Sequence, residues 1–251
     1  MSGRNGGRAS RPKHPEKPLI YAFCEGKSEA QYLKQLKKRF EKVAVIRVKA
    51  GPNDEGFKTQ LFKEAVSQFE KTPSLQNDAE VTDEIWLVFD TNDTDGGEKN
   101  WDFILKKMNK LRKKKPKPGI RVRLLMTTGC LEYWLLLHFR KCLPSIQCKA
   151  ERDRVENELN QLCLKKWNLA YEKGNPNVIC LIFDNGLDTA VENGKSYLKE
   201  LEKDGLPPLD NPSEPDNHQL DSRYQWLLSS QATFTTVQEA ITALRERKPI
   251  T

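Results

Sequence analysis

The chain has 251 residues, of which 37% are hydrophobic and 31% charged, and all its apolar runs are too short to cross a membrane. This composition excludes an integral membrane protein and indicates a soluble, rather polar protein with a sizeable core, built as one large domain or two small ones. The formal net charge of +7 favours a polyanionic partner, chiefly nucleic acid, either DNA or RNA.

Six cysteines are spread through apolar segments without any Cys-x-x-Cys pair. This spacing argues against a zinc site and against a disulfide framework, and it fits a reducing cytoplasm best. The basic N-terminus is not followed by the apolar segment of a secretory signal, so we expect a cytoplasmic protein. Residues 1–17 are rich in Gly, Arg, Lys and Pro and are predicted to form a disordered basic tail.

Apolar strands alternate with amphipathic helices from residue 18 onwards. The strand at 84–89 is apolar at nearly every position, which predicts a central strand buried on both faces, whereas arginines alternate along 120–126 and place that strand nearer an edge. The order predicts an α/β fold with a mostly parallel four-stranded sheet flanked by helices. We expect strands at 18–24, 43–48, 84–89 and 120–126, helices at 28–42, 57–70, 101–111, 130–139, 151–167, 189–204, 220–228 and 233–247, and loops at 72–83 and 206–217.

Glu25 follows the first predicted strand, where the chain turns into a helix. Gly26 allows the sharp turn, and Ser28 with Gln31 three residues later has the pattern of a capping box. Chemistry in open α/β sheets is found at this strand-to-helix position. The alternative is that Glu25 is a solvated loop carboxylate.

A second acidic segment follows the strand at 84–89. It contains Asp90, Asn92, Asp93 and Asp95. Parallel strands end along one edge of the sheet, so these residues and Glu25 are predicted to face one crevice if the two strands are neighbours. Clustered carboxylates repel one another unless a cation neutralises them, and Mg²⁺ is the natural oxygen-liganded ion. The alternative is a solvated or Ca²⁺-like loop, although the terminal Glu of an EF-hand is missing.

Two sets of lysines are candidate phosphate contacts. Lys27 stands at a predicted helix N-terminus, which is an anion-binding position. Lys113, Lys114 and Lys115 form the densest part of the basic run at 106–117, and binding through them is expected to weaken steeply with salt. The alternative for this run is a solvated helix end whose cations complement the helix dipole.

The apolar helix predicted at 130–139 carries an acid and a histidine. Glu132 lies in its first turn. There it either interacts favourably with the positive end of the helix dipole or reaches the crevice and holds a second metal ion. His138 lies on another part of the helix surface, and a histidine there is more often a hydrogen-bonded core residue than a ligand. Both readings of each residue remain open from the sequence.

Three segments together resemble a known family. Residues 24–30 and 89–93 are similar to the Glu and Asp-x-Asp motifs of TOPRIM domains, and residues 128–139 resemble the Cys-Phe-Glu-x-Trp-Leu-Leu-Leu-His-Phe segment of RloB-like proteins. RloB-like proteins are TOPRIM-related and often encoded near phage-defence loci. One departure stands out, because Asn92 replaces the second acid of Asp-x-Asp, and Asp93 or Asp95 is the candidate substitute.

The resemblance implies a TOPRIM-like (Rossmann-like) catalytic core at 18–140 and a helical C-terminal extension at 141–251 that packs on it. It implies that Asp90 and Asp93 bind Mg²⁺ or Mn²⁺, and that Glu25 completes the metal shell or acts as general acid/base. It favours a helix for the run at 178–183, which by pattern fits a strand equally well. Asn211, Ser213 and His218, with His138, are candidates for a second site.

The expected function is therefore that of a metal-dependent nuclease of the TOPRIM/RloB type in prokaryotic anti-phage defence. An alternative from another class is a non-catalytic nucleic-acid- or partner-binding subunit of a defence complex, and primase-like nucleotidyl transfer uses the same acids. Candidate partners include a second copy of the chain or another subunit of a defence complex, and no membrane. The sequence does not distinguish DNA from RNA as the substrate.

Overall fold

The computed structural model describes residues 17–91, 100–116 and 118–247. Residues 1–16 of the predicted tail at 1–17 lie outside these residues, as do three candidate metal ligands, Asn92, Asp93 and Asp95. Within them, the predicted α/β fold is confirmed. The four strands are β1 (Leu19–Cys24), β2 (Val45–Lys49), β3 (Thr82–Asp90) and β4 (Arg121–Thr127).

The strands form one parallel sheet in the order β2-β1-β3-β4, so β1 and β3 are central neighbours as predicted. Cys24 pairs with Val88, and Asp90 pairs with Thr127, so β1, β3 and β4 end along the same edge. This is the C-terminal edge of the sheet, where Glu25 and Asp90 emerge. All six residues of β1 are buried, because helices cover both faces.

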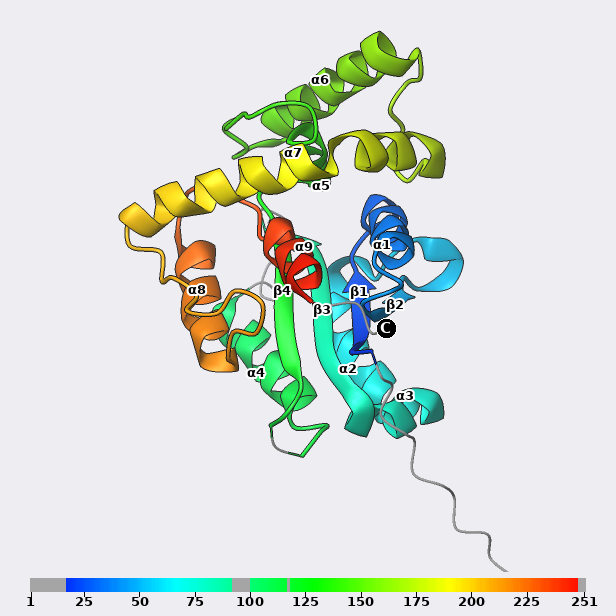
Figure 1. The fold of residues 1–251 in the computed structure, drawn as a ribbon, viewed down its shortest axis with the longest axis vertical. Helices are drawn as coiled ribbons and strands as arrows, with labels where there is room; N and C mark the ends of the chain where they lie inside the picture. Colours follow the sequence, from blue (N-terminus) through cyan, green and yellow to red (C-terminus); the bar gives the residue numbers. More distant parts are fainter. Residues whose placement is uncertain (1–16, 92–99, 117, 248–251) are drawn as a thin grey trace, which may run out of the picture.

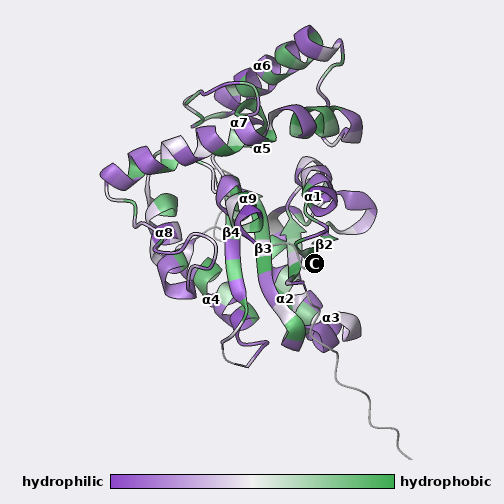
Figure 2. Ribbon diagram, in the orientation of Figure 1, coloured by the Kyte–Doolittle hydropathy of each residue, from purple (hydrophilic) through white to green (hydrophobic). Residues whose placement is uncertain are grey.

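Alternate residues of the central strands build two hydrophobic cores, one on each face of the sheet. One core joins Ala22 and Trp86 to α1, α5, α6, α7 and α9, and the other joins Phe23 and Leu87 to α2, α3, α4 and α8. The hydrophobic strands thus lie between more hydrophilic helices (Figure 2). The helices are α1 (Lys27–Arg39), α2 (Leu61–Lys71), α3 (Pro73–Asp78), α4 (Trp101–Arg112), α5 (Leu131–Leu136), α6 (Lys149–Trp167), α7 (Pro176–Lys203), α8 (Asn217–Ser229) and α9 (Val237–Glu246).

The helices α5, α6 and α7 lie above the C-terminal edge of the sheet, and α9 lies across β3 and β4 (Figure 1). Thr235, just before α9, forms an isolated antiparallel bridge with Thr127 at the end of β4. Each core draws residues from both sides of residue 140, so the C-terminal helices share the cores of the sheet. No helix in the described part of the chain has the length and apolarity that a bilayer crossing needs.

Several local expectations are corrected by the structure. The helix α1 begins at Lys27 with Gly26 as its N-cap, so Ser28 does not cap it. A short helix, α3, occupies part of the segment predicted as a loop at 72–83. The run at 178–183 is helical, as the resemblance implied, and it continues into the following predicted helix as the 28-residue α7.

The arginines of β4 belong to a charge cluster around the buried carboxylate of Glu84. Arg123 is only 1% exposed, although β4 is an edge strand, and its Nε lies 3.0 Å from Oε2 of Glu84 on the neighbouring strand. Arg121 and Arg247 bind Oε1 of the same carboxylate at 2.8 and 2.6 Å. Burial alone would raise the pKa of Glu84, but the three guanidinium groups lower it to about 2.

Candidate active site at the carboxyl edge of the sheet

A cavity of about 610 Å³ opens where α1, α5 and α6 meet above the ends of β1 and β3. Acidic and basic side chains line it together. The acids are Glu29, Glu55, Asp90, Glu132, Asp153 and Glu156, and the cations are Lys27, Lys58, Lys149, Arg152 and Lys173.

Glu25 and Asp90 meet at this edge. Glu25 extends the ladder by one residue, because its N–H donates to the carbonyl of Val88 at 3.1 Å. Its side chain turns toward β3, and Oε2 accepts a hydrogen bond from the Asp90 N–H at 3.3 Å. The structure therefore brings together the two acids on which the predicted crevice depends.

Glu29 is a third acid at this site, and the sequence reasoning missed it as a functional candidate. It lies in the first turn of α1, four residues after Glu25, and is 6% exposed. A Cβ at Gly26 would stand 2.6 Å from Oε2 of Glu29, so the glycine leaves room for this carboxylate to fold back over the helix start. Burial raises the pKa of Glu29 to about 7, and the negative charges of Glu132 and Glu25 add to the effect.

Glu132 reaches the same cavity and is 3% exposed. The hydroxyl of Tyr171 donates to its Oε1 at 2.7 Å, and Nζ of Lys173 lies 4.0 Å from that oxygen. Burial raises the pKa of Tyr171, so the phenol keeps its proton and remains a donor. Of the two readings of Glu132, the structure favours a position in the crevice.

The segment after α6 ties this carboxylate network to α1. Oγ of Ser28 lies 3.4 Å from the Tyr171 hydroxyl and accepts a hydrogen bond from the Gly174 N–H at 3.0 Å. Lys173 also pairs with Glu156 of α6 at 3.0 Å. Tyr171 and Lys173 carry no sequence signal beyond their family resemblance, because only the tertiary fold returns this segment to the cavity.

The predicted lysines fall at two different places. Lys27 lines the cavity and pairs with Glu55 at 3.3 Å. Lys115 instead binds the carbonyl of Thr82, the first residue of β3, and Lys114 pairs with Glu70. Lys113, Lys114 and Lys115 thus stand near the N-terminal edge of the sheet, at the end opposite to Glu25, and nucleic-acid contact through them stays a prediction.

The four candidates for a second site do not form one. His138 is buried, with Nδ1 3.0 Å from the Trp134 carbonyl and Nε2 3.1 Å from the Tyr32 hydroxyl. Burial lowers its pKa to about 4, so it is a neutral core histidine at physiological pH. Asn211 and Ser213 line a separate cavity of about 780 Å³ beside the start of β4. His218 is exposed on α8 and belongs to neither cavity.

The donor set at the carboxyl edge consists of carboxylates, which suit a hard ion such as Mg²⁺ or Mn²⁺. Burial raises the pKa of Glu29, and the charges of Glu132 and Glu25 raise it further, so a divalent cation bound beside these carboxylates would stabilise their ionised forms. Among the described residues, no group of three or more His, Cys, Asp and Glu side chains is arranged as a ready metal site. The acids Asp93 and Asp95 lie outside those residues.

The fold and this edge define a class: an α/β protein with a parallel sheet and a carboxylate-lined cavity at its C-terminal edge. A comparison with protein families matches residues 20–244 to the model described as RloB-like protein. The chain therefore belongs to the RloB-like family. Comparisons with curated proteins and with solved structures found no match.

Proposed function

We propose that this RloB-like protein is a metal-dependent nuclease of the TOPRIM type, acting in the cytoplasm in defence against phage. The observation that carries the proposal is the meeting of Glu25 and Asp90, with the hydrogen bond from the Asp90 N–H to Glu25 Oε2. Glu29 and Glu132 join them from the start of α1 and α5. Four acids from three segments meet at one sheet edge, which is the usual position of an active site in a parallel α/β sheet.

In this proposal, Glu25 and Asp90 hold Mg²⁺ or Mn²⁺, with further oxygen ligands from Asn92, Asp93 or Asp95, and Glu29 stays outside the metal shell. When bound, the ion polarises a phosphodiester and lowers the pKa of a bound water, and a second ion near Glu132 would form a two-metal clamp. Glu29, four residues after Glu25, moves a proton at its carboxylate. A pKa near 7 suits Glu29 for general acid/base work at neutral pH.

The cavity also holds the cations that a phosphate-bearing substrate needs. Lys27, Lys149 and Arg152 line it from α1 and α6, on two sides of the acids. Tyr171 and Lys173 act as positioning residues, because they orient Glu132 by a hydrogen bond and an ion pair. Nucleic-acid phosphates supply the negative charge that such cations recognise.

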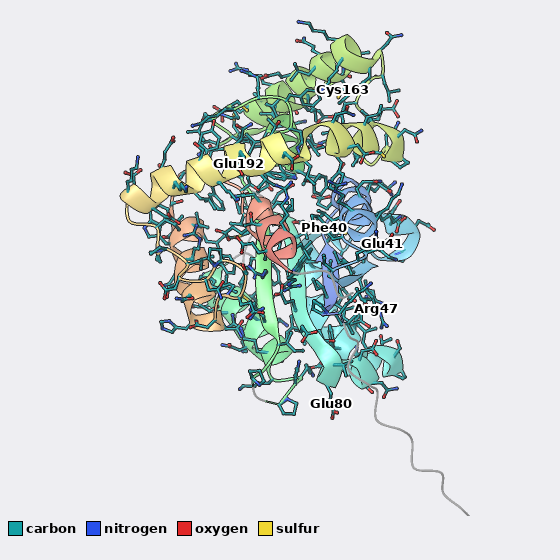
Figure 3. All side chains as sticks on the ribbon, viewed as in Figure 1. Phe40, Glu41, Arg47, Glu80, Cys163 and Glu192 are labelled. Atoms are coloured by element: carbon teal, nitrogen blue, oxygen red, sulfur yellow. The ribbon has the colours of Figure 1, made fainter. Side chains whose placement is uncertain are left out.

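The test is metal-dependent cleavage of plasmid DNA, RNA and tRNA by Glu25→Gln and Asp90→Asn. Each variant removes one charged oxygen without changing shape, so cleavage is expected to fall by a factor of about 100 or more while nucleic-acid binding is kept. Glu80→Gln is the matched control, because Glu80 is exposed and lies at the end of the molecule away from α6 (Figure 3). Equal cleavage by wild type and both site variants would contradict the proposal.

A second candidate is a nucleic-acid- or partner-binding subunit without catalysis. The observation in its favour is that the described residues alone contain no ready three-ligand metal group. This candidate is supported if the wild-type protein binds nucleic acid but, with Mg²⁺ or Mn²⁺, cuts none of the three substrates.

A further inference from the structure

The loop between β2 and α2, residues 50–58, is strained where it passes the candidate active site. Lys58 has φ +48°, and Asn53 and Asp54 have φ +54° and +59°. Asn and Asp tolerate the left-handed region because their short side chains bond locally, but Lys does not share that property. A strained non-glycine residue persists only where the surrounding structure fixes it, and such residues cluster at functional sites.

Backbone hydrogen bonds fix Lys58 directly onto Glu25. The Lys58 N–H donates to the Glu25 carbonyl at 2.9 Å, and the Phe57 N–H donates to the Cys24 carbonyl at 3.0 Å. The Phe57 ring packs on Phe23 of β1, with centroids 6.1 Å apart. Gly56 has φ +81°, and a Cβ there would collide with the Glu25 carbonyl, so the loop approaches Glu25 as closely as glycine permits.

The side chain of Lys58 has no structural task that accounts for this strain. It is exposed and lines the acidic cavity. Lys27 pairs with Glu55 and Lys173 with Glu156, whereas Lys58, like Lys149 and Arg152, forms no ion pair with any residue of the described ranges. An exposed lysine that only filled space could adopt an unstrained backbone. The strained backbone therefore fixes the point beside Glu25 from which the Lys58 side chain extends.

We propose that Lys58 is a substrate-binding residue that contacts a phosphate of a nucleic-acid strand at the mouth of the cavity. The inference rests on the proposed function, because it takes the substrate to be a phosphodiester chain. The shared backbone bond fixes the Lys58 backbone beside Glu25, so that its flexible side chain starts from the mouth of the cavity. A nucleic-acid chain bound by Lys58 has its phosphodiester bonds close to the acids that act on them.

The experiment measures binding of fluorescein-labelled single-stranded DNA and RNA oligonucleotides in Ca²⁺ at several salt concentrations. Lys58→Asn removes the charge but tolerates the left-handed backbone, so affinity is expected to fall about 5- to 10-fold. The slope of log K against log salt should shrink by about 0.7, the value for one phosphate contact on a single strand. Lys58→Arg keeps the charge and should keep the slope.

Two further variants separate the phosphate contact from a structural role. Lys58→Gly relieves the strain and removes the charge, so it should raise the Tm by about 2–4 °C while weakening binding as Lys58→Asn does. Lys71→Gln removes an exposed cation at the end of α2, which does not line this cavity, and should leave affinity and slope unchanged.

The outcomes distinguish this inference from the proposed function. If the wild type cuts nucleic acid and Lys58→Asn keeps both affinity and salt slope, the phosphate contact is wrong and the nuclease stands. If the wild type binds without cutting, and Lys58→Asn lowers the slope of log K against log salt by about 0.7, the phosphate contact is supported and the nuclease is wrong. If the wild type binds neither oligonucleotide, the phosphate contact is overturned, and the cleavage assay with plasmid DNA, RNA and tRNA decides the nuclease separately.

Discussion

Buried glutamates lie at both ends of the parallel sheet, and their electrostatic surroundings are opposite. Glu84, near the start of β3, is bound by three arginines, and its pKa is lowered to about 2. Glu29, at the carboxyl edge, has acids as its strongest charged neighbours, and burial together with them raises its pKa to about 7. At one end three arginines favour the ionised carboxylate, and at the other burial and neighbouring acids favour the protonated form.

This difference separates a structural charge from a functional one. A buried carboxylate with its full set of partners holds elements together, and here it joins β3, β4 and the end of the chain after α9 through Arg247. Buried carboxylates that crowd one another store unfavourable charge repulsion, and that arrangement is typical of active sites. Each prediction below tests one side of this contrast.

The largest effect is expected at the neutralised end. Arg123→Ala leaves Glu84 buried with fewer partners, which should lower the free energy of unfolding by about 3–5 kcal/mol, as for other broken buried ion pairs. Urea denaturation measures the change. A loss below about 1 kcal/mol would mean that the cluster is not a structural anchor.

The two glutamates should give opposite pH dependences of stability. The pKa of Glu29 is raised from 4.5 to about 7, so its contribution is favourable while it is protonated and falls as pH rises through that window, by about 3 kcal/mol at most. The pKa of Glu84 is lowered from 4.5 to about 2, so its contribution is present above pH 4.5 and is lost as pH falls toward 2.

Denaturation curves of wild type, Glu29→Gln and Glu84→Gln between pH 3 and pH 9 measure both effects. Glu29→Gln should remove most of the decline above pH 5, and Glu84→Gln should flatten the acid limb. An unchanged decline in Glu29→Gln would show that its carboxylate is not held among like charges.

A smaller effect is expected at Tyr171. Tyr171→Phe removes the hydrogen bond to Glu132 and leaves that buried carboxylate short of a donor, which should lower the free energy of unfolding by about 1–3 kcal/mol. Because Tyr171 positions an acid of the proposed site, nuclease activity should fall more than nucleic-acid binding. Equal stability of Tyr171→Phe and wild type would argue against this link.

The sequence predicted the sheet well because the apolar pattern within each strand is enough to indicate it. The apolar runs that became β1 and β3 have the continuous pattern of central strands, and their shared edge follows from parallel topology, which brought Glu25 and Asp90 together. For His138, the sequence favoured a hydrogen-bonded core residue over a ligand. The structure agrees, because it buries His138 between Trp134 and Tyr32.

The errors arose where tertiary contacts decide. The alternating arginines correctly predicted that β4 is an edge strand, but the pattern does not show that Arg123 is buried against Glu84 of the neighbouring strand. Ser28 has the pattern of a helix cap, but its hydroxyl is used by Gly174 from a segment 146 positions away. Glu29 was read as part of a motif only, because nothing local shows that Glu132 comes close to it.

The central claim is that the acids at the carboxyl edge bind a divalent cation. Calorimetric titration with Mn²⁺ at pH 7.5 tests it most directly. Wild type and Glu80→Gln should bind Mn²⁺ equally, and Glu25→Gln and Asp90→Asn should bind it at least about 10-fold more weakly, as removal of a charged oxygen ligand requires. Equal Mn²⁺ affinity in all four proteins would contradict the account.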